Sequence, residues 1–331
     1  MTIDVKTDVK TDVKTEVKTE VNTESNTETT PTFKSGFVSI IGRPNAGKST
    51  LLNALVGQKV AIVADKPQTT RTSIQGVVTT PEAQIIFIDT PGIHRANSQL
   101  NKRLMDTVRN SLEERDLLVY VADAARKFTE QDEHAIDVAK RTDTPCVLAL
   151  NKIDLVKDKA HLLPLIEQYQ KLYEFADYVP VSSVKRGGTA ELLKVILKYL
   201  PEGPHYFPDD HVTDQPERFL AGELIREKVL RATHQEVPHA VAVTVDKWQD
   251  GPKMTTIYAT IHLERDGQKA IVIGTGGTML KQIGTLARQE MERLFGLKIY
   301  LDLHVRVQPN WRENRSFLNA MDWRTMTEDD T

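Results

Sequence analysis

Cysteine is almost absent from this chain, because Cys146 is the only one among its 331 residues. A single cysteine excludes a disulfide and a cysteine-based metal site within one molecule, and it fits a reducing compartment. Pro145 precedes Cys146 and the apolar residues 147–150 follow it, so we predict that Cys146 is buried in a strand.

Long apolar runs and an excess of charge are also missing. No run approaches the roughly eighteen residues of a membrane-spanning helix, and the first residues lack the apolar core of a signal peptide. The formal net charge is −3, so overall charge indicates neither a nucleic acid nor a membrane as partner. We therefore expect a cytoplasmic protein, and its length predicts two domains of about 100–200 residues each.

Aromatic side chains are missing from residues 1–32. This segment repeats Val-Lys-Thr followed by Asp or Glu, and a valine at every fourth position cannot form a hydrophobic core. We expect a disordered low-complexity tail, either as a tolerated extension or as a functional tail.

Apolar strand-like runs alternate with helical segments from residue 33 to residue 200. This alternation predicts an α/β domain with a mostly parallel sheet and helices on both faces. The expected strands are 38–41, 77–80, 85–88, 117–122, 146–150 and 178–181. The expected helices are 48–56, 99–112, 129–140, 162–175 and 189–200.

Proline and glycine residues then interrupt the alternation, so residues 201–217 are expected to form a linker. Residues 218–310 predict a smaller α+β domain with the order helix, two strands, two helices, strand. Its expected segments are 218–234, 240–248, 255–265, a short apolar segment at 270–273, 278–295 and 298–308. Residues 311–331 are expected to form a polar C-terminal tail.

The strongest motif is a pair of glycines separated by four residues and followed by Lys and Ser, between an apolar strand and a helix. This context is typical of a phosphate-binding loop, because the backbone wraps the phosphates at a helix N-terminus. We expect Lys48 to reach the β- and γ-phosphates and the Ser49 hydroxyl to hold Mg²⁺. The alternative is a glycine turn with an accidental Lys-Ser pair. The residues assigned to this loop are Gly42, Arg43, Pro44, Asn45, Ala46, Gly47, Lys48, Ser49 and Thr50.

A second motif follows the apolar strand 85–88. Asp89 is expected to orient Mg²⁺ through its water shell, and Gly92 allows a backbone N–H to approach the γ-phosphate. Taken alone, this pattern also describes an ordinary turn. Ile93 comes next, and an isoleucine side chain cannot orient an attacking water. The residues assigned to this part of the site are Asp89, Thr90, Pro91, Gly92 and Ile93.

A third motif predicts which base is bound. Guanine presents two adjacent donors that the Asp154 carboxylate can accept, whereas adenine would leave Asp154 unpaired at a cost of about 1–3 kcal/mol. We expect Lys152 to lie along the base and Asn151 to tie this segment to the phosphate loop. Ser182 and Ser183, after another predicted strand, are expected to complete the guanine pocket through backbone N–H groups. A capping turn is the alternative for each of these two segments. The residues assigned to the base site are Asn151, Lys152, Ile153, Asp154, Ser182 and Ser183.

Residues 65–71 form a polar, proline-broken segment that is long enough to move. Its threonine hydroxyls could close on Mg²⁺ when a γ-phosphate is present. We favour Thr70 over Thr69 as the ligand because Thr70 directly precedes Arg71. The expected Mg²⁺ ligands are therefore Ser49, Thr70 and Asp89, and the expected catalytic residues are Lys48, Thr70 and Gly92.

Five elements in their order along the chain resemble the translation-factor-like GTPases: the phosphate loop, residues 65–71, the Asp89 segment, the Asp154 segment and the Ser182-Ser183 segment. The resemblance implies binding of GTP and GDP with Mg²⁺, and hydrolysis of GTP to GDP and phosphate. Many such GTPases have a Gln where this chain has Ile93, so the usual way of positioning water is missing and we expect slow intrinsic turnover. Asn45 is similar to a residue of members that bind K⁺ near the phosphates; an ordinary polar loop residue is the alternative.

A glycine-rich loop in the smaller domain has the Gly-x-x-Gly form of a KH domain, which lays a nucleic-acid backbone against a helix N-terminus. A plain helix start or a second nucleotide loop would also fit it. Lys281 and Arg288 are expected to meet phosphates, and Ile271, Ile273 and Ile283 to line a groove or the core. The residues assigned to RNA binding are Gly274, Thr275, Gly276, Gly277, Lys281 and Arg288.

The middle of this loop lacks the usual basic residue, so other residues must supply phosphate affinity. The candidates are Arg306, Trp311, Arg312 and Arg315, with Trp311 either stacking on a base or packing the tail against the domain.

A GTPase domain with an apolar residue after Asp-Thr-Pro-Gly, joined by a short linker to a C-terminal KH domain, resembles the Era family. Residues 223–228 and 234–239 are similar to that family's entry into the KH domain. The resemblance implies a type II KH domain and a monomer. It also implies a factor that binds 16S-type rRNA of the small ribosomal subunit near its 3′ end and assists rRNA processing and 30S biogenesis.

The family also implies peripheral association with the inner face of the cell membrane in some contexts. One alternative is therefore a membrane-associated regulatory GTPase whose KH-like domain binds protein. A second is an RNA-binding module in which the nucleotide is only structural.

Overall fold

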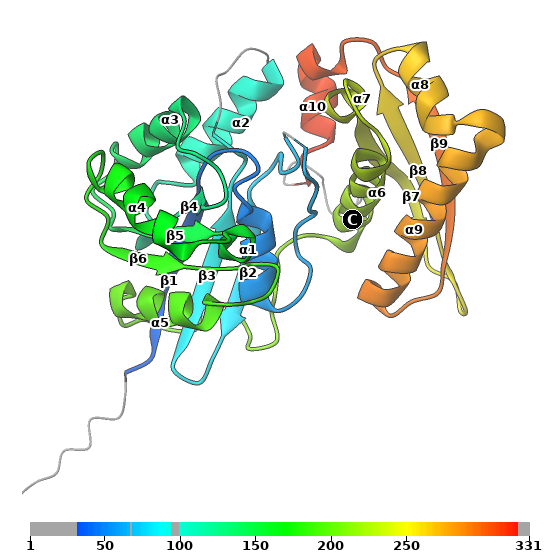
Figure 1. The fold of residues 1–331 in the computed structure, drawn as a ribbon. Helices are drawn as coiled ribbons and strands as arrows, with labels where there is room; N and C mark the ends of the chain where they lie inside the picture. The colour runs from blue at the N-terminus through cyan, green and yellow to red at the C-terminus, as the bar shows by residue number, and fades with distance from the viewer. Residues whose placement is uncertain (1–31, 67, 94–98, 324–331) are drawn as a thin grey trace, which may run out of the picture. The chain divides into compact units, whose positions relative to one another are not determined.

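The computed structural model describes residues 32–66, 68–93 and 99–323 (Figure 1). The low-complexity tail expected for residues 1–32 lies outside these ranges, except for Thr32. In the part of the chain that the structure describes, no helix is long and apolar enough to cross a membrane. Cys146 is a buried free thiol at the start of strand β5 (Cys146–Asn151), as predicted.

Six strands form the larger sheet in the order β2-β3-β1-β4-β5-β6. Besides β5, these strands are β1 (Lys34–Ile41), β2 (Ile74–Thr79), β3 (Ala83–Asp89), β4 (Leu117–Asp123) and β6 (Asp177–Pro180). Neighbouring strands are parallel except that β2 runs antiparallel to β3. The prediction of a mostly parallel sheet is confirmed.

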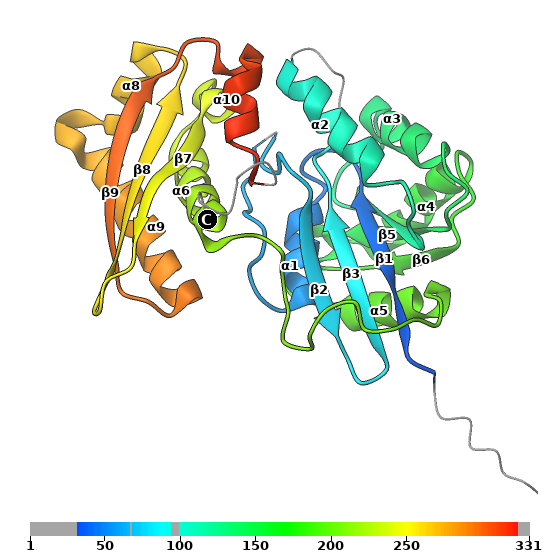
Figure 2. The same cartoon turned by 180° about the vertical axis from the view of Figure 1, so that it is seen from behind.

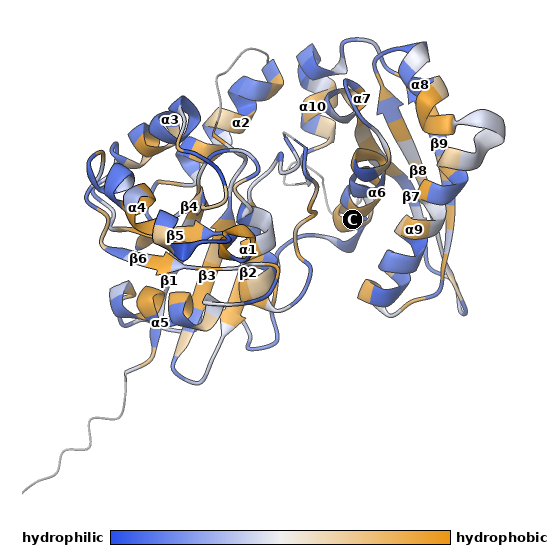
Figure 3. Cartoon of the chain, viewed as in Figure 1, coloured by the Kyte–Doolittle hydropathy of each residue, from blue (hydrophilic) through white to orange (hydrophobic). Residues whose placement is uncertain are grey.

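Helices cover both faces of this sheet (Figures 1 and 2). Their bounds are α1 (Lys48–Val56), α2 (Gln99–Asn110), α3 (Glu130–Ala139), α4 (Leu162–Gln170) and α5 (Thr189–Tyr199). Helices α1 and α5 pack into the core on one face, and α2, α3 and α4 pack into the core on the other. Strands β3, β4 and β5 are therefore buried along their whole length, and hydrophobic colour follows the strands of this sheet in Figure 3.

The topology brings the predicted motifs to one edge of the sheet. The phosphate loop follows β1, Asp89 ends β3 and Asn151 ends β5. Because β1, β3 and β5 lie in one parallel array, their carboxyl ends meet at the same edge, where α/β proteins bind nucleotides.

The segment after α5 runs along the antiparallel side of the sheet. The Val77 N–H donates to the Val212 carbonyl oxygen at 2.8 Å, and Nε2 of Gln84 donates to the Phe207 carbonyl oxygen at 2.9 Å. The bond to Val212 pairs a backbone N–H of the edge strand β2 that would otherwise be exposed.

The second sheet has three strands in the order β7-β8-β9, with β7 antiparallel and β9 parallel to β8. Helices α6 and α9 pack on one of its faces around a second apolar core, which also includes Ile62 from the segment between α1 and β2. The predicted order of elements is present, and the apolar segment at 270–273 is the end of helix α8. The bounds are α6 (Glu217–Ala232), α7 (Val237–Ala240), β7 (Ala242–Gln249), β8 (Thr255–Leu263), α8 (Asp266–Ile273), α9 (Thr278–Phe295) and β9 (Ile299–Val307).

The segment after β9 is more ordered than the polar tail expected from the sequence. It contains a short 3-10 turn at Trp311–Glu313 and helix α10 (Arg315–Ala320). Trp311 and Leu318 are buried in a small apolar cluster with Leu100 and Leu104 of α2. The pattern missed this helix because only two of its side chains are large and apolar and both need partners distant in sequence.

Candidate nucleotide and nucleic-acid sites

The loop between β1 and α1 wraps around the side chain of Lys48. Gly42 and Gly47 have φ values of +143° and +96°, which favour glycine, and a side chain at Gly47 would collide with Nδ2 of Asn151. Nζ of Lys48 donates to the carbonyl oxygens of Gly42 at 3.2 Å and Arg43 at 3.0 Å. Burial lowers the pKa of Lys48 to about 8, against the opposing effect of Asp89. A bound phosphate would stabilise the charged ammonium here.

Three side-chain oxygens from different elements meet beside this loop. Oγ of Ser49 lies 2.6 Å from Oδ2 of Asp89 and 2.8 Å from Oγ1 of Thr70. Oγ1 of Thr70 lies 3.4 Å from the same carboxylate oxygen. The predicted ligand set Ser49, Thr70 and Asp89 is therefore assembled in space.

The chemistry of these oxygens suits Mg²⁺. Oδ1 of Asp89 is buried and has no hydrogen-bond partner among the described residues, and burial raises the pKa of Asp89 to about 6, although Lys48 opposes the shift. A cation beside the carboxylate would reverse that shift. Mg²⁺ combines one or two protein oxygens with phosphate and water oxygens, so it does not need the cluster of three or more His, Cys, Asp or Glu side chains that residues 32–66, 68–93 and 99–323 lack.

Thr69 and Thr70 differ clearly in where their hydroxyls lie. Oγ1 of Thr69 donates to the carbonyl oxygens of Ala64 at 3.2 Å and Lys66 at 2.7 Å, within its own loop. Thr70 is the one that meets Ser49, which agrees with the preference for Thr70. A cavity of about 60 Å³ lies between this loop and the phosphate loop.

The base-reading segment is tied to the phosphate loop as expected. Nδ2 of Asn151 donates to the Ala46 carbonyl oxygen at 3.0 Å, and Oδ1 of Asn151 accepts from the Ser183 N–H at 3.1 Å and from its hydroxyl at 2.8 Å. The Ser182 hydroxyl donates to Oδ1 of Asp154 at 2.6 Å. The two predicted segments therefore lie against each other, with the Asp154 carboxylate held from one side.

Asp123, at the end of β4, is a site residue that the sequence reasoning missed. Its Oδ2 accepts from Nζ of Lys152 at 2.8 Å, while the same Nζ donates to the Asn45 carbonyl oxygen at 2.6 Å. Arg43 lies 4.0 Å from Asp123 and 3.2 Å from Asp132. The signal was an acidic residue directly after a buried strand, the feature that identified Asp89.

The segment from Asp89 to Ile93 approaches the phosphate loop closely. A side chain at Gly92 would lie 2.8 Å from Pro44, so only glycine allows this approach. The Thr90 hydroxyl donates to the Ile40 carbonyl oxygen at 2.8 Å. The Ile93 N–H donates to the Gly42 carbonyl oxygen at 3.3 Å, but the Ile93 side chain is fully buried in the core. Ile93 therefore contributes its backbone to the site and no side chain.

The Gly-x-x-Gly segment lies between α8 and α9 and has the backbone that its composition allows. Gly274, Gly276 and Gly277 all have positive φ, at +72°, +61° and +78°, and Thr275 and Gly276 are exposed. A Cβ at Gly274 would lie 2.7 Å from Met279. The loop thus exposes backbone at the N-terminus of an eighteen-residue helix, a suitable place for a phosphate.

The residues around this loop divide between surface and core. Ile271 is half exposed, whereas Ile283 is buried in the core of the smaller unit, which comprises α6 to β9 at residues 217–307. Lys281 is exposed on α9, and Arg288 makes an ion pair with Glu292 at 2.9 Å. Lys281 is therefore the freer of the two predicted phosphate contacts, because Arg288 is already engaged.

The Trp311 side chain packs inside the protein, in the apolar cluster with Leu318, and does not offer its ring to a base. Its side chain is fully buried, and its Nε1 donates to the Ala240 carbonyl oxygen at 2.8 Å. Arg312 forms an ion pair with Glu264 at 2.5 Å. The alternative in which Trp311 offers a stacking surface to RNA is therefore wrong, since its ring is covered by the protein.

Comparison with known proteins agrees with this geometry. Residues 37–152 match the family described as 50S ribosome-binding GTPase, and residues 236–312 match the KH domain family. A GTPase Era from Staphylococcus haemolyticus is 47% identical over 289 residues, which cover 87% of this chain and 96% of that protein.

The chain belongs to the Era family of GTPases.

Two solved Era structures have the same fold. Era in complex with MgGDPNP and nucleotides 1506–1542 of 16S ribosomal RNA matches with a TM-score of 0.85 and 41% identity, covering 87% of this chain and 98% of that one. A single-residue variant of Aquifex aeolicus Era bound to GDP·AlF4⁻ matches with a TM-score of 0.84 and 41% identity, covering 87% and 99%. As an Era-family member, this chain is a GTPase with a P-loop domain followed by a KH domain.

Proposed function

We propose that this GTPase binds 16S-type rRNA near its 3′ end and assists rRNA processing and biogenesis of the small ribosomal subunit. The supporting observation is that one chain carries the guanine-nucleotide motifs and an exposed Gly-x-x-Gly loop, and that 87% of it matches an Era structure in complex with 16S ribosomal RNA. In this proposal residues 33–200 bind the nucleotide, 201–217 link the domains and 218–310 bind RNA.

The nucleotide would be held from both ends. Lys48 would exchange its two backbone carbonyl acceptors for the β- and γ-phosphates, and the Gly92 N–H would contact the γ-phosphate. The Asp154 carboxylate would accept from the two adjacent guanine donors, in the position that the Ser182 hydroxyl fixes. The bond from Asn151 to Ala46 would keep the base and phosphate subsites at a fixed separation.

Mg²⁺ would be held by Ser49 and Thr70, with Asp89 acting on its water shell, and it would neutralise charge on the β- and γ-phosphates. In this proposal Thr70 would reach Mg²⁺ only while its loop is closed over the nucleotide, so closure of the loop is expected to depend on the γ-phosphate. Hydrolysis proceeds without a water-positioning side chain at Ile93, because that side chain is in the core. Lys48 and the Gly92 N–H would still stabilise the transferred phosphoryl group. Because no side chain at Ile93 would position the attacking water, we expect slow intrinsic turnover.

RNA would lie with its backbone against Gly274–Gly277 and unpaired bases on the surface beside Ile271. Lys281 would meet a phosphate directly, and Arg288 only after leaving Glu292. Because net charge is slightly negative, affinity would come from this local surface rather than from the whole protein.

Binding of a 16S 3′-terminal RNA fragment, measured with GDP and with a non-hydrolysable GTP analogue, tests this function. We expect binding in both states with different affinities, because the nucleotide orders the Thr70 loop. Equal affinities would favour an RNA-binding module in which the nucleotide is only structural. Failure to bind any single-stranded rRNA fragment would favour the membrane-associated regulatory GTPase instead.

We also propose a cytoplasmic location, in keeping with a buried free cysteine and an rRNA target. Cell fractionation tests this directly. Recovery in the membrane fraction, released by salt, would instead indicate peripheral membrane association.

A further inference from the structure

Helix α6, the first helix of the smaller unit, reaches the loop that carries Thr70. Nη1 of Arg226 donates to the Gln68 carbonyl oxygen at 3.3 Å, and Nη2 of Arg226 donates to the Thr69 carbonyl oxygen. Arg226 is almost fully buried. Its guanidinium therefore holds the two peptide groups that directly precede Thr70.

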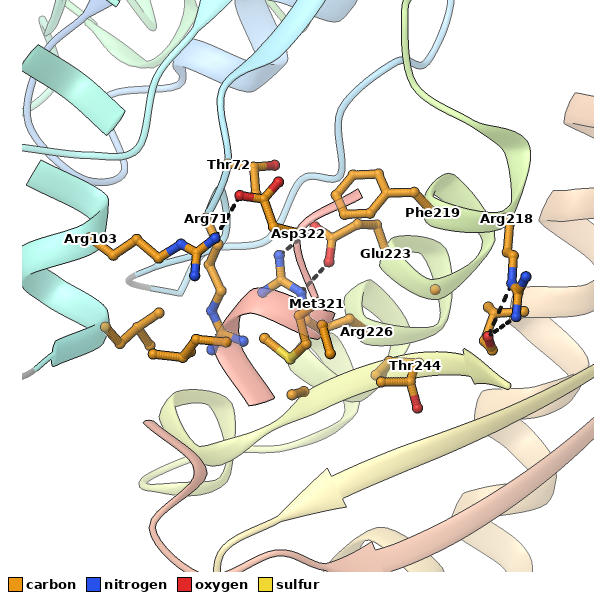
Figure 4. Close-up of a pocket in the computed structure, with 17 residues that line it drawn as sticks. Arg71, Thr72, Arg103, Arg218, Phe219, Glu223, Arg226, Thr244, Met321 and Asp322 are labelled. Atoms are coloured by element: carbon orange, nitrogen blue, oxygen red, sulfur yellow. Dashed lines mark hydrogen bonds and ion pairs between the residues drawn. The ribbon is translucent and has the colours of Figure 1, made fainter. Parts of the chain in front are cut away.

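Arg226 is itself held in place by a second residue of α6. Glu223 accepts from Nε at 2.7 Å and from Nη2 at 2.6 Å, and Figure 4 shows this pair at the wall of a cavity of about 300 Å³. Such a paired geometry fixes the plane of the guanidinium. The remaining donor directions then point at the loop carbonyls.

The loop backbone needs support at this place. Gln68 has a φ of +60°, an uncommon conformation for a residue other than glycine that persists when surrounding contacts hold it. Nε2 of Gln68 donates to Oδ1 of Asn101 at 2.7 Å. Beyond Thr70, Nη1 of Arg71 donates to the Val241 carbonyl oxygen at 2.7 Å and its guanidinium lies 5.3 Å from the Trp311 ring centroid. The residues on both sides of Thr70 are therefore held by hydrogen bonds to other elements.

We propose that Arg226 is a positioning residue for GTP hydrolysis, which holds the Thr70 hydroxyl at Ser49 and Asp89 from a helix of the RNA-binding unit. This inference rests on the proposed roles of Thr70 and Mg²⁺ in the nucleotide site. It does not require Arg226 to touch nucleotide, metal or water. GDP binding uses no contact from Thr70 in this account, so Arg226 acts on the triphosphate state alone.

The test is single-turnover GTP hydrolysis at a series of Mg²⁺ concentrations, with the full chain and its Arg226→Gln and Arg226→Lys variants. For Arg226→Gln we expect the Mg²⁺ concentration at half-maximal rate to rise about tenfold or more, since charge-assisted bonds to two carbonyls are lost. Arg226→Lys retains the charge but cannot bond both carbonyl oxygens through one planar guanidinium. Its Mg²⁺ concentration at half-maximal rate should therefore lie between the values of the wild type and Arg226→Gln. GDP affinity should be unchanged in both variants.

Arg218→Gln is the matched control on the same helix, because Arg218 donates to the Val245 and Asp246 carbonyl oxygens of its own unit. It should leave the Mg²⁺ dependence unchanged. Glu223→Gln, which loosens Arg226 without removing it, should raise the Mg²⁺ requirement by less than Arg226→Gln.

Three outcomes are distinguishable. An Arg226→Gln protein with normal GDP affinity and a normal Mg²⁺ dependence overturns the positioning role. Equal losses of GDP affinity and of hydrolysis also overturn it, because they indicate general destabilisation. Absence of Mg²⁺-dependent hydrolysis in the wild-type chain would instead remove the proposed function of the nucleotide site.

Discussion

Nδ2 of Asn151 donates to the carbonyl oxygen of Ala46 across 3.0 Å, and this bond joins the base-reading segment to the phosphate loop. Both residues are buried. Because the bond is between a side chain of β5 and the backbone before α1, it directly connects the two halves of the candidate nucleotide site.

Replacing Asp154 with Asn should reduce the preference for guanine. An amide offers one acceptor oxygen and brings its own donors to face the guanine donors, so GDP affinity should weaken by about 1–3 kcal/mol, or roughly 5-fold to 150-fold. Fluorescent GDP titration measures this. Asp137→Asn, an exposed change on α3, should leave the affinity unaltered, and an equal GDP affinity in both variants would contradict the guanine assignment.

Glu227→Gln should lower the free energy of unfolding by about 2–3 kcal/mol, because a fully buried carboxylate that accepts several charge-assisted hydrogen bonds is lost, while Lys59 and Lys228 keep their ion pairs with Glu290. Glu227 is fully buried and accepts from Lys59 at 2.7 Å, Lys228 at 2.8 Å and Arg231 at 3.0 Å. Urea unfolding of full-length protein provides the measurement. Glu217→Gln, in the first turn of the same helix, should cost less than about 0.5 kcal/mol.

The stability of the smaller unit should depend on pH through His262. Burial lowers the pKa of His262 below its ordinary value of 6.5, with Arg306 adding to the shift and Asp246 opposing it. The unfolded chain therefore takes up a proton that the folded state resists, so stability is lost as pH falls below about 6.5. The melting temperature of the wild type should fall more between pH 7.5 and 5.5 than that of His262→Gln.

His304→Gln, which changes an exposed histidine of β9, is the control and should follow the wild-type pH curve. Parallel curves for wild type and His262→Gln would show that His262 does not carry this dependence.

GTP hydrolysis should be faster in K⁺ than in Na⁺ at the same ionic strength. Asn45 has a φ of +61° within the phosphate loop, and a K⁺ beside it would add positive charge near the phosphates. Asn45→Ala should remove the difference between the two ions. Equal rates in both salts for the wild type would leave Asn45 as an ordinary polar loop residue.

Local patterns predicted much of the nucleotide site. Lys48 and Ser49 begin the helix after β1, and Asp89 and Asn151 end β3 and β5, so a parallel sheet brings these four side chains together. The choice of Thr70 over Thr69 agreed with the geometry, although its basis was only the neighbouring Arg71.

Contacts between distant segments could not be predicted in the same way. Arg226 lies in a helix that carries charges along most of its length, and nothing local indicates which charge meets the Thr70 loop. Trp311 was equally compatible with stacking and packing until its Nε1 was found on Ala240. Helix α10 is short and depends on α2 for its apolar partners, so its periodicity alone was uninformative.

Crosslinking of the full-length protein to native RNA, followed by mapping of the joined nucleotides and residues, tests the central claim most directly. We predict crosslinks between the 3′-terminal segment of 16S-type rRNA and residues beside Gly274–Gly277, with a yield that changes between GDP and a GTP analogue. Crosslinks confined to other RNAs, or none above the level of a Gly276→Asp variant, would contradict it.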